Sequence, residues 1–199
     1  MNKQQTISKP VSLKGVGIHS GNEVNLTFKP ANEDFGYAFC RTDLPGNPII
    51  EADVNYVVST ERGTTLEKNG VNIQTSEHVL AALTGLEIDN VLIEIDASEP
   101  PIMDGSSKFF VEALIDAGIE EQSKNRNEYV VKEIISYHDE ESGSDITVLP
   151  ADSYEVTAMV DFGTKILGTQ NATMKNLSEF KDNFSNARTF SFLHEIEML

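Results

Sequence analysis

The chain has 199 residues, of which 39% are hydrophobic and 24% charged, an ordinary balance for a globular protein. Its formal net charge of −17 argues against nucleic acid as a partner, because nucleic-acid binding needs a basic surface. It also argues against electrostatic attachment to anionic lipid. No stretch approaches the ~18 apolar residues that span a bilayer, and the first residues lack the apolar core of an export signal. We therefore expect no stable membrane insertion. The single cysteine, Cys40, excludes an internal disulfide and fits a cytoplasmic protein.

Strand patterns dominate the first hundred residues. Apolar and polar residues alternate over residues 23–29, which predicts a half-buried strand. Further strands are expected over residues 37–41, 49–58 and 90–95. Asn69-Gly70 lies between two short strand-like runs and predicts a hairpin, because both residues tolerate a positive φ.

Two helices are expected in the same half of the chain. Thr75 or Ser76 can cap the N-terminus of the first helix, and Gly85 can end it. The second helix is expected over residues 106–117, with a glycine just past its end.

Residues 120–127 (EEQSKNRN) are polar and aperiodic, which is typical of a linker. Beyond them the pattern predicts strands over residues 129–137, 145–149 and 154–162, followed by a helix over residues 177–186. Strands followed by helices, twice, favour an α+β fold over an alternating α/β sheet.

This order divides the chain into a first domain over residues 1–122 and a second over residues 128–199. We expect the second domain to be incomplete. Few residues follow the linker, and a final helix expected from Phe192 or Leu193 has no stop signal before residue 199.

Glu77 and His78 are adjacent in the first turn of the first expected helix. Adjacent helical residues diverge by about 100°, so both side chains can face one cleft but cannot bind one atom as a pair. This suits an imidazole that holds a metal and a carboxylate that handles the proton of a metal-bound water. The alternative is a capping or solvent-exposed histidine beside a glutamate that favours the positive helix end. The pair alone favours this alternative.

Five motifs change that balance. In chain order they are GVGIHSG (15–21), TSEHVLAAL (75–83), DNV (89–91), PIMDGS (101–106) and ARTFSF (187–192). Together they closely resemble the UDP-3-O-acyl-N-acetylglucosamine deacetylase family, the zinc amidases of lipid A synthesis. The resemblance runs from about residue 3 to the last residue. It implies two similar two-layer sandwich domains, each a sheet packed on a helix pair, with the second domain truncated and the active site between the two.

The resemblance also implies a catalytic Zn²⁺. His78 would be one ligand, and a His and an Asp one helical turn apart in the second domain would be the others. No His-x-x-x-Asp spacing occurs from residue 78 onward. We therefore expect two of the three ligands, and the family's general-acid histidine, to lie beyond Leu199.

Further roles follow from the resemblance. Glu77 matches the general base and Thr189 the hydroxyl that stabilises the oxyanion. His19 would contact substrate, and Phe190 and Phe192 would line the passage for the acyl chain. The alternatives are a helix-capping Thr189, an exposed His19 in a turn, and aromatic rings that simply pack in a core.

The implied reaction is hydrolysis of the N-acetyl group of UDP-3-O-(3-hydroxyacyl)-N-acetylglucosamine, which releases acetate. This is the committed step of lipid A biosynthesis in the cytoplasm of Gram-negative bacteria. The 199 residues alone are expected to be inactive. Some family members are fused to a C-terminal hydroxyacyl-carrier-protein dehydratase, so a fused domain is possible. The alternative function is a metal-free binding or assembly module that keeps the sandwich fold for packing.

Overall fold

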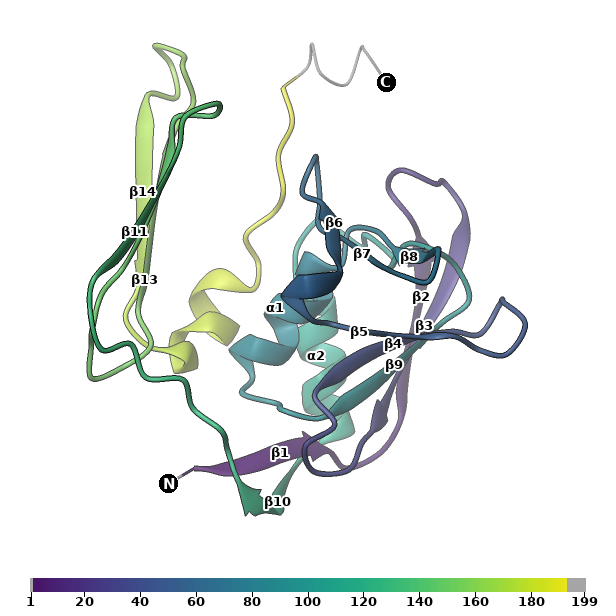
Figure 1. Cartoon of the computed structure of the whole chain (residues 1–199). Coiled ribbons are helices and arrows are strands. Elements are labelled where there is room, and N and C mark those ends of the chain that lie inside the picture. Colours follow the sequence, from purple (N-terminus) through teal and green to yellow (C-terminus); the bar gives the residue numbers. More distant parts are fainter. Residues whose placement is uncertain (1, 193–199) are drawn as a thin grey trace. The chain divides into compact units, whose positions relative to one another are not determined.

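The computed structural model describes residues 2–192 and shows an α+β fold with many strands and few helices (Figure 1). Residues 2–126 and 180–192 form one compact unit, and residues 127–179 form another. The strands and helices of residues 2–126 are β1 (Lys3–Ile7), β2 (Val11–Val16), β3 (Glu23–Pro30), β4 (Tyr37–Arg41), β5 (Ile49–Glu51), η1 (Val54–Tyr56), β6 (Val57–Ser59), β7 (Thr65–Lys68), β8 (Val71–Ile73), α1 (Glu77–Gly85), β9 (Val91–Ile95), α2 (Lys108–Ala117) and β10 (Ile119–Asn125).

A five-stranded sheet in the order β2-β3-β9-β4-β5 organises the first unit. Strands β4 and β9 are parallel and the other pairs are antiparallel. The alternation expected over residues 23–29 is confirmed, because Val24, Leu26 and Phe28 of β3 are fully buried. The expected strands over residues 37–41 and 90–95 are confirmed as β4 and β9.

Helices α1 and α2 pack together and share one hydrophobic core with the sheet (Figure 1). The ring of Phe110 in α2 meets that of Phe28 in β3 edge to face, with centroids 6.4 Å apart. Each fully buried side chain of this size contributes roughly 1.5–3 kcal/mol through the apolar area it removes from water. Both helices were expected from the sequence, and both begin and end within two residues of the expected bounds.

A separate three-stranded sheet, β6-β7-β8, precedes α1. Its β7-β8 hairpin confirms the turn predicted at Asn69-Gly70, since both residues have positive φ (53° and 77°). The single strand expected over residues 49–58 is wrong. Asp53 accepts a hydrogen bond from the N–H of Asn55 and caps the short helix η1, which separates β5 from β6.

The segment expected as a linker contains a strand. Strand β10 covers residues 119–125 and pairs antiparallel with β1, more than a hundred residues earlier in the chain. Almost all of β10 is exposed, so its sequence lacks the apolar alternation that marks a half-buried strand. The pairing of β10 with β1 therefore cannot be predicted from the residues of either strand alone.

The second unit consists of two antiparallel hairpins. Strands β11 (Ile135–Asp139) and β12 (Ser144–Val148) form one, and β13 (Val156–Asp161) and β14 (Thr169–Met174) form the other. Strand β14 was not expected, and β11 begins six residues later than the predicted strand over residues 129–137. The sandwich architecture expected for this region stays a prediction.

Where one helix was expected over residues 177–186, the chain forms a short 3₁₀ helix, η2 (Leu177–Glu179), followed by a π-helix, η3 (Phe180–Phe184). The ring of Phe180 packs on the core of the first unit so closely that a Cβ on Gly85 would lie 2.0 Å from it. The final helix expected from Phe192 or Leu193 lies outside the described residues. Within residues 2–192 no helix is both long and apolar enough to cross a membrane.

Candidate functional site

The start of α1 is fixed to the loop before β7 by three hydrogen bonds. The N–H and the hydroxyl of Ser76 donate to the carbonyl of Thr64 at 3.2 and 3.0 Å. In return the N–H of Thr64 donates to Oε2 of Glu77 at 2.8 Å. Ser76 occupies the N-cap position of α1, one of the two expected, but its hydroxyl donates to the carbonyl of Thr64 and makes no cap bond within the helix. This exchange fixes the Glu77 carboxylate.

Glu77 and His78 lie side by side at this helix start. Oε1 of Glu77 is 3.9 Å from Nε2 of His78, and their side chains are 38% and 18% exposed. Gly63 lies against the carboxylate, since a Cβ there would be 3.3 Å from Oε1. One carboxylate oxygen is thus held by a backbone donor. The other is near the imidazole and within reach of solvent, an arrangement suited to taking a proton from water.

The loop before α2 ties His78 to the rest of the candidate site. The hydroxyl of Ser107 donates to the carbonyl of His78 at 3.0 Å. Asp104, in the same loop, accepts the N–H and the hydroxyl of Ser106 at 3.2 and 2.6 Å. The loop therefore has a fixed shape where it meets α1.

Residues near position 189 contact this same loop although they are more than eighty positions away in sequence. The guanidinium of Arg188 pairs with Asp104 at 3.0 Å, and the N–H of Thr189 donates to the carbonyl of Gly105 at 2.8 Å. The hydrogen bond from Ser106 and the charge of Arg188 hold the pKa of the Asp104 carboxyl below its usual range. One short loop thus contacts both His78 and the segment carrying Thr189.

His19 is placed by a residue that sequence analysis missed. Its N–H and that of Ser20 donate to the carboxylate of Glu99, which also accepts the hydroxyl of Thr75. The only sequence signal was an acidic residue between a strand and two prolines, which is not specific. Glu99 connects the glycine-rich turn to the residue two positions before Glu77.

The two aromatic residues of the ARTFSF motif contact each other. The rings of Phe190 and Phe192 meet edge to face at 5.9 Å, and Phe190 is 60% exposed. This exposure leaves Phe190 accessible for contact with a ligand.

The described residues do not form a complete metal site. Within residues 2–192 no three His, Cys, Asp or Glu side chains converge as a metal-binding group. A catalytic zinc needs three protein ligands and one open position. His78, with its imidazole partly exposed beside a carboxylate, has the chemistry of a possible single ligand.

Comparison with known proteins decides the family. The sequence model of the UDP-3-O-acyl N-acetylglycosamine deacetylase (LpxC) family matches residues 4–199. The chain belongs to this family.

Its relatives in the family are considerably longer. The "UDP-3-O-acyl-N-acetylglucosamine deacetylase" of Geotalea uraniireducens is 43% identical over 98% of this chain and 64% of its own length. The "Bifunctional enzyme LpxC/FabZ" of Chlorobaculum tepidum is 46% identical over 98% of this chain, and that of Bacteroides thetaiotaomicron 42% identical over all of it. The chain spans 42% and 43% of these two bifunctional relatives.

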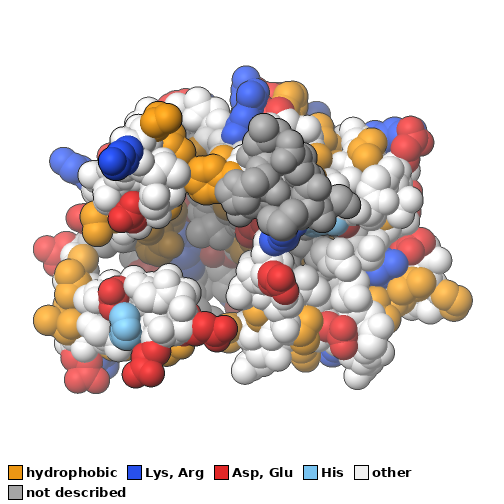
Figure 2. Space-filling view, turned by 90° about the horizontal axis from the view of Figure 1, so that it is seen from above, with side chains coloured by type: hydrophobic (Ala, Val, Ile, Leu, Met, Phe, Trp, Pro, Cys, Tyr) orange, Lys and Arg blue, Asp and Glu red, His pale blue; other side chains and the backbone are white. Residues whose placement is uncertain are grey.

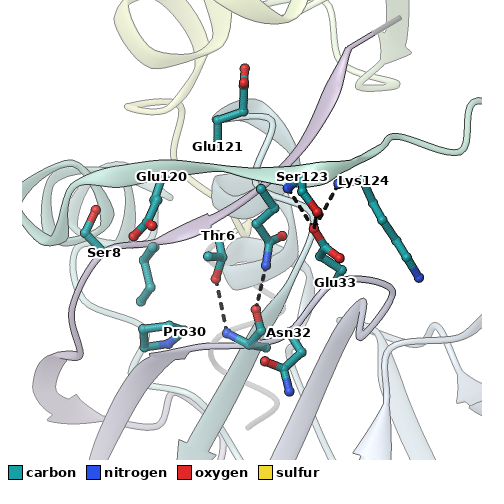
Figure 3. A pocket seen from close by; sticks show the side chains of 12 residues that line it. Thr6, Ser8, Pro30, Asn32, Glu33, Glu120, Glu121, Ser123 and Lys124 are labelled. Atoms are coloured by element: carbon teal, nitrogen blue, oxygen red, sulfur yellow. Dashed lines mark hydrogen bonds between the residues drawn. The ribbon is translucent and has the colours of Figure 1, made fainter.

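A cavity of about 650 Å³ is a separate feature of this LpxC-family chain (Figure 3). It is lined by β1, β10 and the segment after β3, and none of the candidate residues contributes to it. Its polar groups largely bond one another. Ser123 and Lys124 donate to Glu33, and Thr6 donates its hydroxyl to the carbonyl of Asn90 while accepting the N–H of Ala31. The cavity is an open pocket where β1 and β10 meet the segment after β3.

Basic side chains do not gather on the face seen in Figure 2, where Lys and Arg are scattered among acidic and uncharged groups. An acidic protein that binds an anionic nucleotide-sugar must concentrate positive charge locally. That concentration is not visible on this face of the described part of the LpxC-family chain.

Proposed function

We propose that the whole protein hydrolyses the N-acetyl group of UDP-3-O-(3-hydroxyacyl)-N-acetylglucosamine to a free amine and acetate. This would be the committed step of lipid A biosynthesis in the cytoplasm of a Gram-negative bacterium. The observation that carries the proposal is the Glu77–His78 pair, 3.9 Å apart and partly exposed at a fixed helix start, in a chain that belongs to the deacetylase family.

In this proposal Glu77 is the general base. The N–H of Thr64 holds Oε2, so Oε1 takes the proton of the water that attacks the amide carbonyl. Positioned acid–base groups of this kind contribute typically 10²–10⁴-fold in rate.

Thr189 would donate its hydroxyl to the oxyanion that develops on the amide carbonyl. Its N–H bond to Gly105 fixes its backbone, and such donors are worth about 3 kcal/mol in other enzymes. His19, Phe190 and Phe192 would contact the substrate, the two rings along its acyl chain.

The proposed cofactor is Zn²⁺, with His78 as one ligand. The described residues do not complete the ligand set. The remaining ligands and the general acid are therefore proposed to come from the additional length that the relatives have. The second sandwich domain, beginning near residue 128, would be completed by the same additional length.

The bifunctional relatives support a further property of the whole protein. Because two relatives at 42–46% identity are named LpxC/FabZ, a hydroxyacyl-carrier-protein dehydratase on the same polypeptide is proposed. The mass of the protein purified from its native cell would show whether the polypeptide is long enough.

The deciding experiment is an acetate-release assay on the whole protein with the UDP-linked N-acetylated substrate. Acetate and free amine should form in equal amounts. A substrate lacking the 3-O-acyl chain is the matched control and should be turned over more slowly. The absence of acetate release from a folded, metal-loaded whole protein would overturn the proposal.

A further inference from the structure

A fully buried carboxylate, Glu99, joins two segments of the candidate site. Its side chain is 0% exposed. Oε2 accepts the N–H groups of His19 and Ser20 at 3.1 and 2.9 Å, and Oε1 accepts the hydroxyl of Thr75 at 3.1 Å. The glycine-rich turn and the start of α1 are therefore bonded to the same side chain.

The donors to Glu99 are neutral backbone N–H groups and hydroxyls. Burial raises the pKa of Glu99, but the N–H groups of Ser20 and His19 and the nearby hydroxyls more than offset this, and the pKa lies below its usual range. Glu99 is therefore ionised at neutral pH. A buried charge is costly, and an apolar side chain would fill the same space without that cost. A buried carboxylate at this position is therefore explained by the hydrogen bonds that it makes to the turn and to the start of α1.

The turn is shaped around this carboxylate. Gly17 approaches so closely that a Cβ there would lie 2.4 Å from Oε2 of Glu99. Two backbone hydrogen bonds close the turn. The N–H of Gly21 donates to the carbonyl of Gly17, and the N–H of Gly17 donates to the carbonyl of Asn22, both at 3.0 Å. The backbone of His19 thus has little freedom while Glu99 is in place.

The segment before α1, which contains Thr75, has a backbone conformation that its own sequence does not favour. Thr75 has a φ of +52°, a conformation that a β-branched residue adopts only when its surroundings impose it. Its hydroxyl bonds Glu99, and the neighbouring Gln74 N–H donates to the carbonyl of Ser98 at 2.8 Å. Glu77 follows two residues later, so the conformation of Thr75 sets where α1 begins.

We infer that Glu99 is a positioning residue of the deacetylation reaction, which fixes the turn carrying His19 against the start of the helix carrying Glu77. It touches neither substrate nor reacting atoms and acts through the backbone of both segments. A displacement of about 1 Å between groups that act together can cost 10²-fold in rate. This inference rests on the proposed function.

The test compares whole-protein variants Glu99→Gln and Glu99→Asp with the matched control Glu33→Gln. Glu33 also accepts N–H and hydroxyl donors, but it lies at the β1–β10 junction. Glutamine keeps the size of Glu99 and turns an NH₂ group toward N–H donors. We expect kcat to fall about 10- to 100-fold in Glu99→Gln, less in Glu99→Asp, and less than twofold in Glu33→Gln. Bound zinc should stay unchanged.

A double-mutant cycle separates positioning from general stability. Because Glu99 holds the turn of His19 as well as the start of α1, Glu99→Gln should cost less turnover in a His19→Ala background than in the wild type. Fully additive losses, or a Glu99→Gln variant that behaves like Glu33→Gln, would overturn the inference.

Hydrogen exchange gives a readout that needs no activity. In Glu99→Gln the amide protons of residues 17–20 and of residues 74–76 should both exchange faster than in the wild type. Faster exchange in neither segment, or in only one, would contradict the inference. If the wild type releases no acetate, the proposed function is wrong. The hydrogen bonds of Glu99 would then not serve deacetylation, whatever the exchange rates show.

Discussion

The N–H of Thr189 donates to the carbonyl of Gly105 at 2.8 Å. This bond joins the ARTFSF motif to the loop that also bonds the carbonyl of His78 through Ser107. Two motifs that lie more than eighty positions apart in the sequence thereby become neighbours of the Glu77–His78 pair.

Replacement of Glu77 and of His78 should give different results in the whole protein. Glu77→Ala should keep zinc and lose turnover by about 10²- to 10⁴-fold, because only the proton acceptor is removed. His78→Ala should lose both zinc and turnover. Metal analysis and acetate release check this, with the exposed Glu67→Gln as control. Near-normal turnover in the zinc-loaded Glu77 variant would refute the base assignment.

Zinc stoichiometry should differ between the 199-residue chain and the whole protein after identical dialysis. We expect about one zinc per whole protein and almost none in the chain alone, because a catalytic zinc needs three protein ligands. Elemental analysis measures both. Stoichiometric zinc in the 199 residues would mean that His78 finds its partners among them, and that the additional length supplies no ligand.

Asp104→Asn should loosen the segment that carries Thr189. In its ion pair with Asp104 the Arg188 side chain is 66% exposed and that of Asp104 is 23% exposed, so solvent screens the pair and the loss of stability should stay below about 1 kcal/mol. Turnover should fall roughly three- to tenfold, equivalent to about 0.6–1.4 kcal/mol of activation free energy. Steady-state kinetics and thermal unfolding measure the two effects. Asp116→Asn, an exposed change on α2, serves as the control, and equal turnover in both variants would argue against the tether.

Gly85→Ala should destabilise the first unit although alanine is the better helix former. Propensity would favour alanine by about 1 kcal/mol, but its Cβ would lie 2.0 Å from the Phe180 ring, and overpacking typically costs 1–3 kcal/mol. Urea unfolding measures the balance. Phe180→Ala in the same background should remove the penalty of the alanine, and a Gly85→Ala variant more stable than the wild type would show that the ring moves freely.

Stability should fall in acid partly through Glu99. Its pKa is below the ordinary value of 4.5 in the folded protein. Its contribution is therefore present above the unfolded-state pKa and is lost as pH falls through the lower folded-state value. Between about pH 6 and pH 3 the wild type should lose more unfolding free energy than Glu99→Gln. Urea unfolding measured across this pH range tests the prediction. Equal losses of unfolding free energy in the wild type and in Glu99→Gln would contradict it.

Local patterns in the sequence were sufficient for the elements of the first unit that bury one face. The alternation in β3, the Asn69-Gly70 turn and the two helices are read from neighbouring residues, because burial on one face repeats every two or every 3.6 positions. The five ordered motifs were likewise enough to indicate the deacetylase family and to single out Glu77 and His78.

The pairing of β10 with β1, the use of the Ser76 hydroxyl on Thr64 and the place of Thr189 beside Gly105 were decided only by the tertiary structure. So was the role of Glu99, a carboxylate whose donors come from residues 19, 20 and 75. In each case the partner is distant in the chain. The free energy of the contact depends on which backbone groups folding brings together, and that leaves no periodic signal in the sequence.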